Sequence, residues 1–170
     1  MTSVMAATYP DLYAAAGIGD GCEYAATATC AGYQSADPTT AGQQAYSAMG
    51  SYARVMPVID FEGDQDNIVP PVNATQLIKQ WQITDGLVMH SSVPTSPTSS
   101  SFGFGGGFNG QTYTTSEYGD GQGHELIQAW VVHGMSHAWS GGSSSEQYSD
   151  PSGPDETAAM YAFFVNHPMG

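Results

Sequence analysis

The sequence has almost no basic side chains. Arg54 and Lys79 are the only lysine or arginine residues, against sixteen acidic residues and a formal net charge of −14. Phosphate backbones and anionic lipid surfaces are negatively charged and repel such a chain, so we expect no nucleic-acid partner and no membrane-surface partner. No apolar run reaches the roughly 18 residues that a membrane-spanning helix needs, so no membrane segment is expected either.

Cysteine is nearly absent too, and Cys22 and Cys30 are the only pair. No Cys-x-x-Cys spacing for zinc occurs, and His133 and His137 lie on a glycine-containing segment that does not place them on one helical face. We therefore predict no metal and no cofactor. The short separation of the two cysteines allows a disulfide, with two buried free thiols as the alternative. A disulfide and a low Lys and Arg content are typical of secreted enzymes, so we expect an extracellular protein.

A chain of 170 residues is long enough for one domain with a core of its own. The strand–helix–strand–helix order in its first half predicts a parallel sheet, and the glycine-rich residues 119–123 predict a hairpin between the last two strands. Apolar patterns predict helices over residues 1–9, 40–53, 73–83 and 155–166, and strands over residues 12–18, 56–61, 112–118 and 125–132.

Residues 91–110 are rich in Ser, Pro and Gly and have no hydrophobic period, which predicts a long loop. Loops of this length in a compact domain are often functional. Phe104 and Phe108 in this segment are therefore candidates for lining a substrate cleft, and an insertion without a binding role is the alternative.

Two polar loops directly follow predicted strands and carry the candidate catalytic residues. Asp66 lies in residues 63–70 and His137 lies in residues 133–142. In α/β-hydrolases the catalytic acid and histidine lie on such loops, in this chain order, and the carboxylate orients the imidazole as a general base. We therefore predict Asp66 as the acid and His137 as the base. The alternatives are an Asx turn at Asp66 and a packed loop histidine at His137.

The serine that would complete this arrangement is missing, because no Gly-x-Ser-x-Gly elbow occurs in the sequence. Residues 134–138 match an elbow in part, which makes Ser136 the candidate substitute nucleophile. Ser136 is bonded directly to the proposed base, and adjacent side chains seldom point at each other. Ser3 would lie about 10 Å along the first helix from the expected position of the nucleophile.

Four segments together resemble the poly(3-hydroxybutyrate) depolymerase-type esterase family, which includes feruloyl and acetylxylan esterases. The resemblance implies an α/β fold, namely a partial α/β-hydrolase three-layer sandwich with a mostly parallel sheet and a C-terminal hairpin. It also implies hydrolysis of a polyester or an esterified plant polysaccharide, with Asp66 and His137 in the two roles above and Trp139 as a candidate for lining the cleft. The segments are residues 1–17, 63–73, 137–142 and 150–155.

The resemblance also indicates what this chain lacks. The family's serine elbow would lie just before the helix that begins at residue 1, so the chain is expected to represent the C-terminal portion of such an esterase and to have low activity alone. Glu62 replaces a frequent histidine of the family, and Asp20 replaces a frequent serine. The alternative function is a non-catalytic module that binds a polymer or carbohydrate through aromatic side chains, with Trp81, Trp130, Trp139 and the Phe-rich part of residues 91–110 as the candidates.

A sheet without its early strands would expose an unpaired edge, which is a template for pairing with another chain. We therefore expect the purified protein to form homo-oligomers through this edge. Light scattering checks the expectation, and a monodisperse monomer would contradict it.

Overall fold

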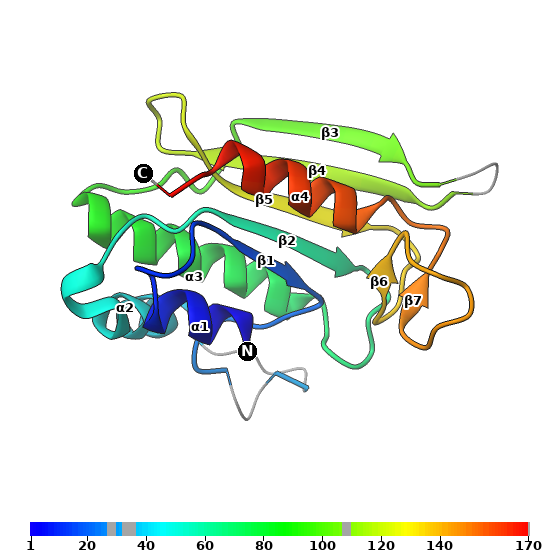
Figure 1. Ribbon diagram of the computed structural model, residues 1–170, viewed down its shortest axis with the longest axis horizontal. Coiled ribbons are helices and arrows are strands. Elements are labelled where there is room, and N and C mark those ends of the chain that lie inside the picture. The colour runs from blue at the N-terminus through cyan, green and yellow to red at the C-terminus, as the bar shows by residue number, and fades with distance from the viewer. Residues whose placement is uncertain (27–29, 32–36, 107–109, 170) are drawn as a thin grey trace.

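The computed structural model describes residues 1–26, 30–31, 37–106 and 110–169, and it forms an α/β sandwich around one five-stranded sheet. Figure 1 shows α1, α2 and α3 along one face of this sheet and α4 along the other. The elements are α1 (Thr2–Thr8), β1 (Ala16–Gly19), α2 (Pro38–Met49), the 3-10 turn η1 (Gly50–Tyr52), β2 (Val58–Gly63), α3 (Val72–Met89), β3 (Ser99–Phe104), β4 (Thr112–Gly119), β5 (Glu125–Val132), β6 (Trp139–Ser140), β7 (Ser149–Asp150) and α4 (Glu156–Asn166).

The strand order in the sheet is β1-β2-β5-β4-β3. The β1–β2 and β2–β5 pairs are parallel, and β4 pairs antiparallel with β5 and with β3. The predicted α/β fold, with a parallel region and a C-terminal hairpin, is confirmed. In a parallel region all strands end at the same edge of the sheet, so the loops after β1, β2 and β5 meet there.

Strand β2 separates two apolar cores, because successive side chains of a strand point to opposite faces. All six of its residues are buried. Val58 packs with the α1–α3 side, where Leu77 and Trp81 of α3 are fully buried. Ile59 and Phe61 pack on the opposite face, beneath α4. The alternation also places Asp60 and Glu62 on the α3 side.

The ends of the helices follow from local sequence. Asp37 accepts a hydrogen bond from the Thr40 amide at 2.8 Å at the start of α2, and Asp155 accepts one from the Ala158 amide at 2.9 Å at the start of α4. Such caps satisfy amide groups that the first helical turn leaves unpaired. Helix α1 has no side-chain cap.

Several sequence predictions need correction. The predicted strand over residues 12–18 is too long, because β1 begins only at Ala16 and Leu12 is exposed. The segment 91–110 is not entirely a loop, because its residues Ser99–Phe104 form β3 and pair with β4 over their whole length. Hydroxyl pairs across the two strands, such as Ser101 and Thr115 at 2.7 Å, help hold this Ser-rich strand. Helix α3 runs to Met89, past the predicted end at residue 83, because the polar residues Thr84 and Asp85 find buried partners.

The predicted disulfide is confirmed, with Cys22 and Cys30 joined and their Cα atoms 5.7 Å apart. Asn73 at the start of α3 donates hydrogen bonds to the carbonyls of Cys30 and Pro70. This side chain therefore ties the disulfide segment to the loop that follows β2. No helix in the described part of the chain has the length and apolarity to cross a membrane.

The buried face of α3 makes a first test of the fold. Leu77→Ala removes a side chain with 0% exposure and should lower the free energy of unfolding by about 2–5 kcal/mol. Leu12→Ala is the matched control, since Leu12 is 66% exposed and its truncation should change stability little. Urea denaturation measures both, and equal midpoints would contradict this packing.

Candidate active site

Asp66 lies in the loop between β2 and α3, and its side chain is buried there. Its Oδ1 accepts hydrogen bonds from the amides of Ile68 at 2.7 Å and Val69 at 2.8 Å. These bonds form the Asx turn that the sequence offered as an alternative to a catalytic role. The turn uses only one carboxylate oxygen, so Oδ2 is left for another partner.

His137 lies in the loop after β5, which turns back at Gly134 with φ +86°. This loop packs tightly against the Asp66 loop. The Gln65 amide donates to the Met135 carbonyl at 2.9 Å, and a Cβ added at Gly63 would lie 2.5 Å from that same carbonyl oxygen. A glycine at position 63 therefore permits the close approach of the two loops.

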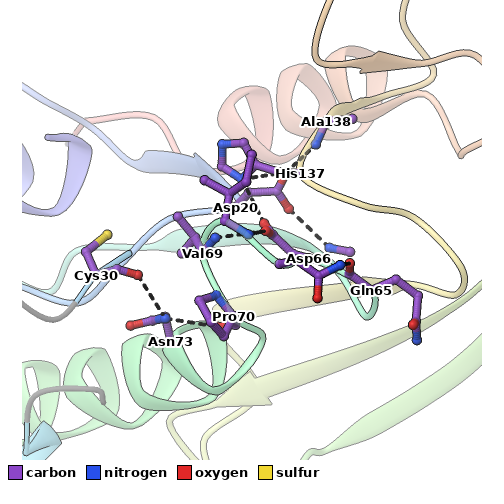
Figure 2. A network of polar contacts seen from close by, with 12 residues as sticks. Asp20, Cys30, Gln65, Asp66, Val69, Pro70, Asn73, His137 and Ala138 are labelled. Atoms are coloured by element: carbon purple, nitrogen blue, oxygen red, sulfur yellow. Dashed lines mark hydrogen bonds and ion pairs between the residues drawn. The ribbon is translucent and has the colours of Figure 1, made fainter. Parts of the chain in front are cut away.

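The two loops bring the predicted acid and base into direct contact. His137 Nδ1 lies 2.7 Å from Asp66 Oδ2. Figure 2 shows the two side chains pointing toward each other. A carboxylate only accepts hydrogen bonds, so Nδ1 donates, and the proton-free nitrogen of neutral His137 is Nε2. Nε2 has no hydrogen-bond partner in the described part of the chain. This arrangement has the acid-oriented imidazole of a general base.

Asp20, at the end of β1, is a third member of the cluster that sequence reasoning did not assign to the site. Its carboxylate accepts the Gly63 amide at 3.1 Å and the Ala138 amide at 2.7 Å, so it links the loop that carries Asp66 to the loop that carries His137 (Figure 2). Burial raises the pKa of Asp20 to about 6. Its position at the end of a parallel strand was the available signal.

The same group of atoms raises the question of a metal. Ligand atoms of Asp20, Asp66 and His137 lie within 4.8 Å of one another, the one such group in the residues that the structure describes. Each carboxylate oxygen of the two acids already accepts at least one N–H hydrogen bond. This pattern fits a hydrogen-bonded acid–histidine cluster better than a cation site, where the oxygens must face the ion.

A second histidine–acid pair lies next to the first. His133 Nδ1 is 3.0 Å from Asp64 Oδ2, and its Nε2 is 2.9 Å from Thr114 Oγ1. Burial alone would raise the pKa of Asp64, but hydrogen bonds from Gly134 and His133 outweigh it and lower the pKa. Both ring nitrogens of His133 are occupied, so this pair connects β4 with the two loops, whereas His137 keeps Nε2 free.

The other residues proposed from the sequence differ in their exposure and in their position relative to the Asp66–His137 pair. Trp139 is 42% exposed and, with Tyr148, lines a cavity of about 170 Å³ beside His137. Ser136 is exposed and has no hydrogen bond to His137 in the structure. Phe104 lies on the edge strand β3 and is 73% exposed. Phe108 lies outside the described residues.

The chain is similar in sequence to two fungal esterases. The chain is 27% identical over 154 residues to feruloyl esterase B of Talaromyces stipitatus, which covers 81% of this chain and 38% of that protein. It is 35% identical over 94 residues to acetylxylan esterase A of Talaromyces purpureogenus, covering 48% of this chain and 25% of that protein. No protein-family model matches.

The fold has a solved counterpart in the acetyl xylan esterase from Aspergillus awamori, with a TM-score of 0.58 and 24% identity over 80% of this chain and 49% of that one. At this identity the likeness shows the fold. The chain spans less than half of the length of each curated relative that it matches. The proteins that this chain resembles in sequence and in fold are thus esterases.

The close approach at Gly63 can be tested by adding one methyl group. Gly63→Ala should push the Met135 carbonyl away, so the Gln65 amide should exchange with deuterium about tenfold faster. Gly106→Ala is the control, because its added Cβ would meet nothing closer than 3.5 Å. Unchanged exchange at Gln65 in Gly63→Ala would contradict the packing of the two loops.

Buried acids should make stability depend on pH. Burial raises the pKa of Asp20 to about 6 and the pKa values of Asp85 and Glu156 to about 8, against 3.8 to 4.5 for exposed carboxyls. At a pH between the ordinary and the raised pKa of each group, the carboxyl is protonated in the folded protein and ionised in the unfolded chain. The free energy of unfolding should therefore fall as the pH rises from about 4 to about 8.

Asp85 allows this dependence to be assigned to a residue. Asp85→Asn keeps an acceptor for the Met56 amide but cannot ionise. The substitution should reduce the slope of the free energy of unfolding against pH by up to about 1.4 kcal/mol per pH unit between about pH 4 and pH 8. This is the contribution of one proton. Urea denaturation at a series of pH values measures the slope. A parent protein that is more stable at pH 8 than at pH 5 would contradict the buried, protonated state of these acids.

Proposed function

We propose that this chain carries the acid and the base of a serine-type carboxylic-ester hydrolase. The observation that carries the proposal is the 2.7 Å contact between Asp66 and His137. His137 lines a cavity, and its Nε2 has no partner among the described residues. In such an enzyme Nε2 accepts the proton of the attacking hydroxyl and later returns it to the leaving group. Asp66 holds the tautomer and stabilises the imidazolium that forms.

The nucleophile is the missing part of the mechanism. A serine elbow is absent from the sequence, and the side chain of Ser136 has no hydrogen bond to His137 in the described part of the chain. The proposal therefore requires a hydroxyl that reaches Nε2 from another segment, as the depolymerase-type resemblance implies. Without it His137 can still activate a water molecule, so we expect slow ester hydrolysis by the chain alone.

The substrate class follows from the relatives and from the size of the cavity. The relatives are named for feruloyl and acetylxylan ester hydrolysis, so esterified plant polysaccharides are the proposed substrates. The cavity beside His137 measures about 170 Å³, which favours a small acyl group such as acetyl over an aromatic one. The disulfide agrees with an extracellular location, where oxidising conditions preserve such bonds.

The alternative, a polymer-binding module, has little support from the three tryptophans. Trp81 is fully buried in the α3 core. Trp130 is sandwiched between Phe61 and Tyr113, with both ring centroids 4.8 Å away. Trp139 alone of the three is substantially exposed. One exposed tryptophan makes a poor platform for a polymer, so a binding module would have to rely on Phe102 and Phe104, which are exposed on β3.

Hydrolysis of 4-nitrophenyl acetate tests the proposed acid and base. His137→Ala should lower the rate about 100-fold, the usual contribution of a general base, and Asp66→Ala should lower it as well. His133→Ala is the matched control, since it removes the neighbouring histidine whose ring nitrogens are both occupied. Equal rates in the parent, His137→Ala and Asp66→Ala proteins would reject the roles of those two residues.

A further inference from the structure

A second and larger cavity lies on the other side of β2 from the helix α4. It measures about 1060 Å³ and lies between α3 and the face of β2, β5 and β4. It shares no lining residue with the cavity beside His137. Binding sites for drug-sized molecules measure roughly 300–1,000 Å³ and are mostly apolar with a few polar groups. The apolar walls here come from both layers, through Ala74, Ile78 and Leu87 of α3 and Ala129 and Val131 of β5.

Two carboxyl groups line the β2 side of this cavity. Asp60 and Glu62 alternate with Ile59 and Phe61, which pack beneath α4, so both acids face α3. Each acid is 1% exposed. Both carboxyl oxygens of Glu62, and Oδ1 of Asp60, have no hydrogen-bond partner in the described part of the chain.

An unpaired buried polar group lowers the stability of a fold, and natural proteins pair nearly all such groups. Asp85 shows the usual solution, because it is equally buried but accepts the Met56 amide at 2.9 Å. Glu62 has no comparable partner although it lines a space large enough for a ligand. A polar group in this state is better suited to binding than to folding.

The charge state of Glu62 determines the kind of ligand. Burial raises its pKa to about 10, and the charges of Asp60, Asp20 and Asp66 add to the rise. Burial also raises the pKa of Asp60 well above its ordinary value. At neutral pH the Glu62 carboxyl therefore carries a proton that it can donate. Lys79 has the one fixed positive charge among the lining side chains, and it is exposed, so no fixed positive charge lies inside the cavity to favour an anion.

We propose that this cavity binds a neutral, largely apolar molecule with a carbonyl oxygen, and that Glu62 donates a hydrogen bond to that oxygen. The apolar walls bury the body of the ligand, and the carbonyl satisfies a carboxyl group that has no partner among the residues that the structure describes. The site does not depend on ester hydrolysis, because the cavity and the His137 centre have no lining residue in common.

Benzophenone and diphenylmethane form a matched pair of probes, since they differ only in a carbonyl in place of a methylene group. Titration into the ¹⁵N-labelled protein, followed by two-dimensional NMR, should shift the amides of Ala129 and Val131. Benzophenone should bind about tenfold more tightly, the ratio that one buried hydrogen bond gives. In Glu62→Leu this ratio should fall to about one. Asp66→Asn should keep the tenfold ratio, which separates this site from the proposed active site.

Glu62→Leu should also raise the urea midpoint of the unliganded protein, because it removes an unpaired polar group. Asp85→Leu is the matched control and should lower the midpoint, because it leaves the Met56 amide without its acceptor. If Glu62→Leu does not fold, Glu62→Gln keeps the shape of the side chain, and its weaker donor should reduce the ratio in part. No amide shift at the cavity with either probe, or a tenfold ratio that survives in Glu62→Leu, would overturn the proposal.

Discussion

The hydrogen bond between His137 and Asp66 joins the ends of two neighbouring parallel strands, and the candidate active site depends on it. It forms because β2 and β5 pair in parallel and end at the same edge of the sheet. The contact also requires the loops to approach closely, which the absence of a side chain at Gly63 permits. Register, loop length and one glycine thus set the geometry of a proton-accepting imidazole before any substrate is present.

A second feature of the structure is its set of buried carboxyl groups. A chain with sixteen acids and two fixed basic side chains cannot neutralise its buried acids with ion pairs. Asp20 instead accepts two backbone amides, and Glu156 accepts the Ser140 amide at 2.9 Å. Glu62 has no such partner in the described ranges, and burial raises its pKa to about 10. The difference separates acids that position loops from an acid that is available to a ligand.

Sequence reasoning located the strands β2 and β5 and predicted roles for Asp66 and His137, which lie in contact in the structure, because strong apolar runs followed by polar loops are local signals. Strand β3 was not predicted, because its Ser, Gly and Phe residues have the composition of a loop and are ordered by pairing with β4. The place of Asp20 in the site was not predicted for a different reason. Its role depends on the register of three strands that bring residues 20, 63 and 138 together, and no local pattern records that register.

The tautomer of His137 tests the central account most directly. Long-range ¹H–¹⁵N NMR correlations on the imidazole at neutral to alkaline pH distinguish a proton on Nδ1 from one on Nε2. The account predicts the Nδ1–H tautomer in the parent protein, held by the Asp66 carboxylate, and a loss of this preference in Asp66→Ala. A proton on Nε2 in the parent, or the same tautomer with and without the carboxylate, would contradict it.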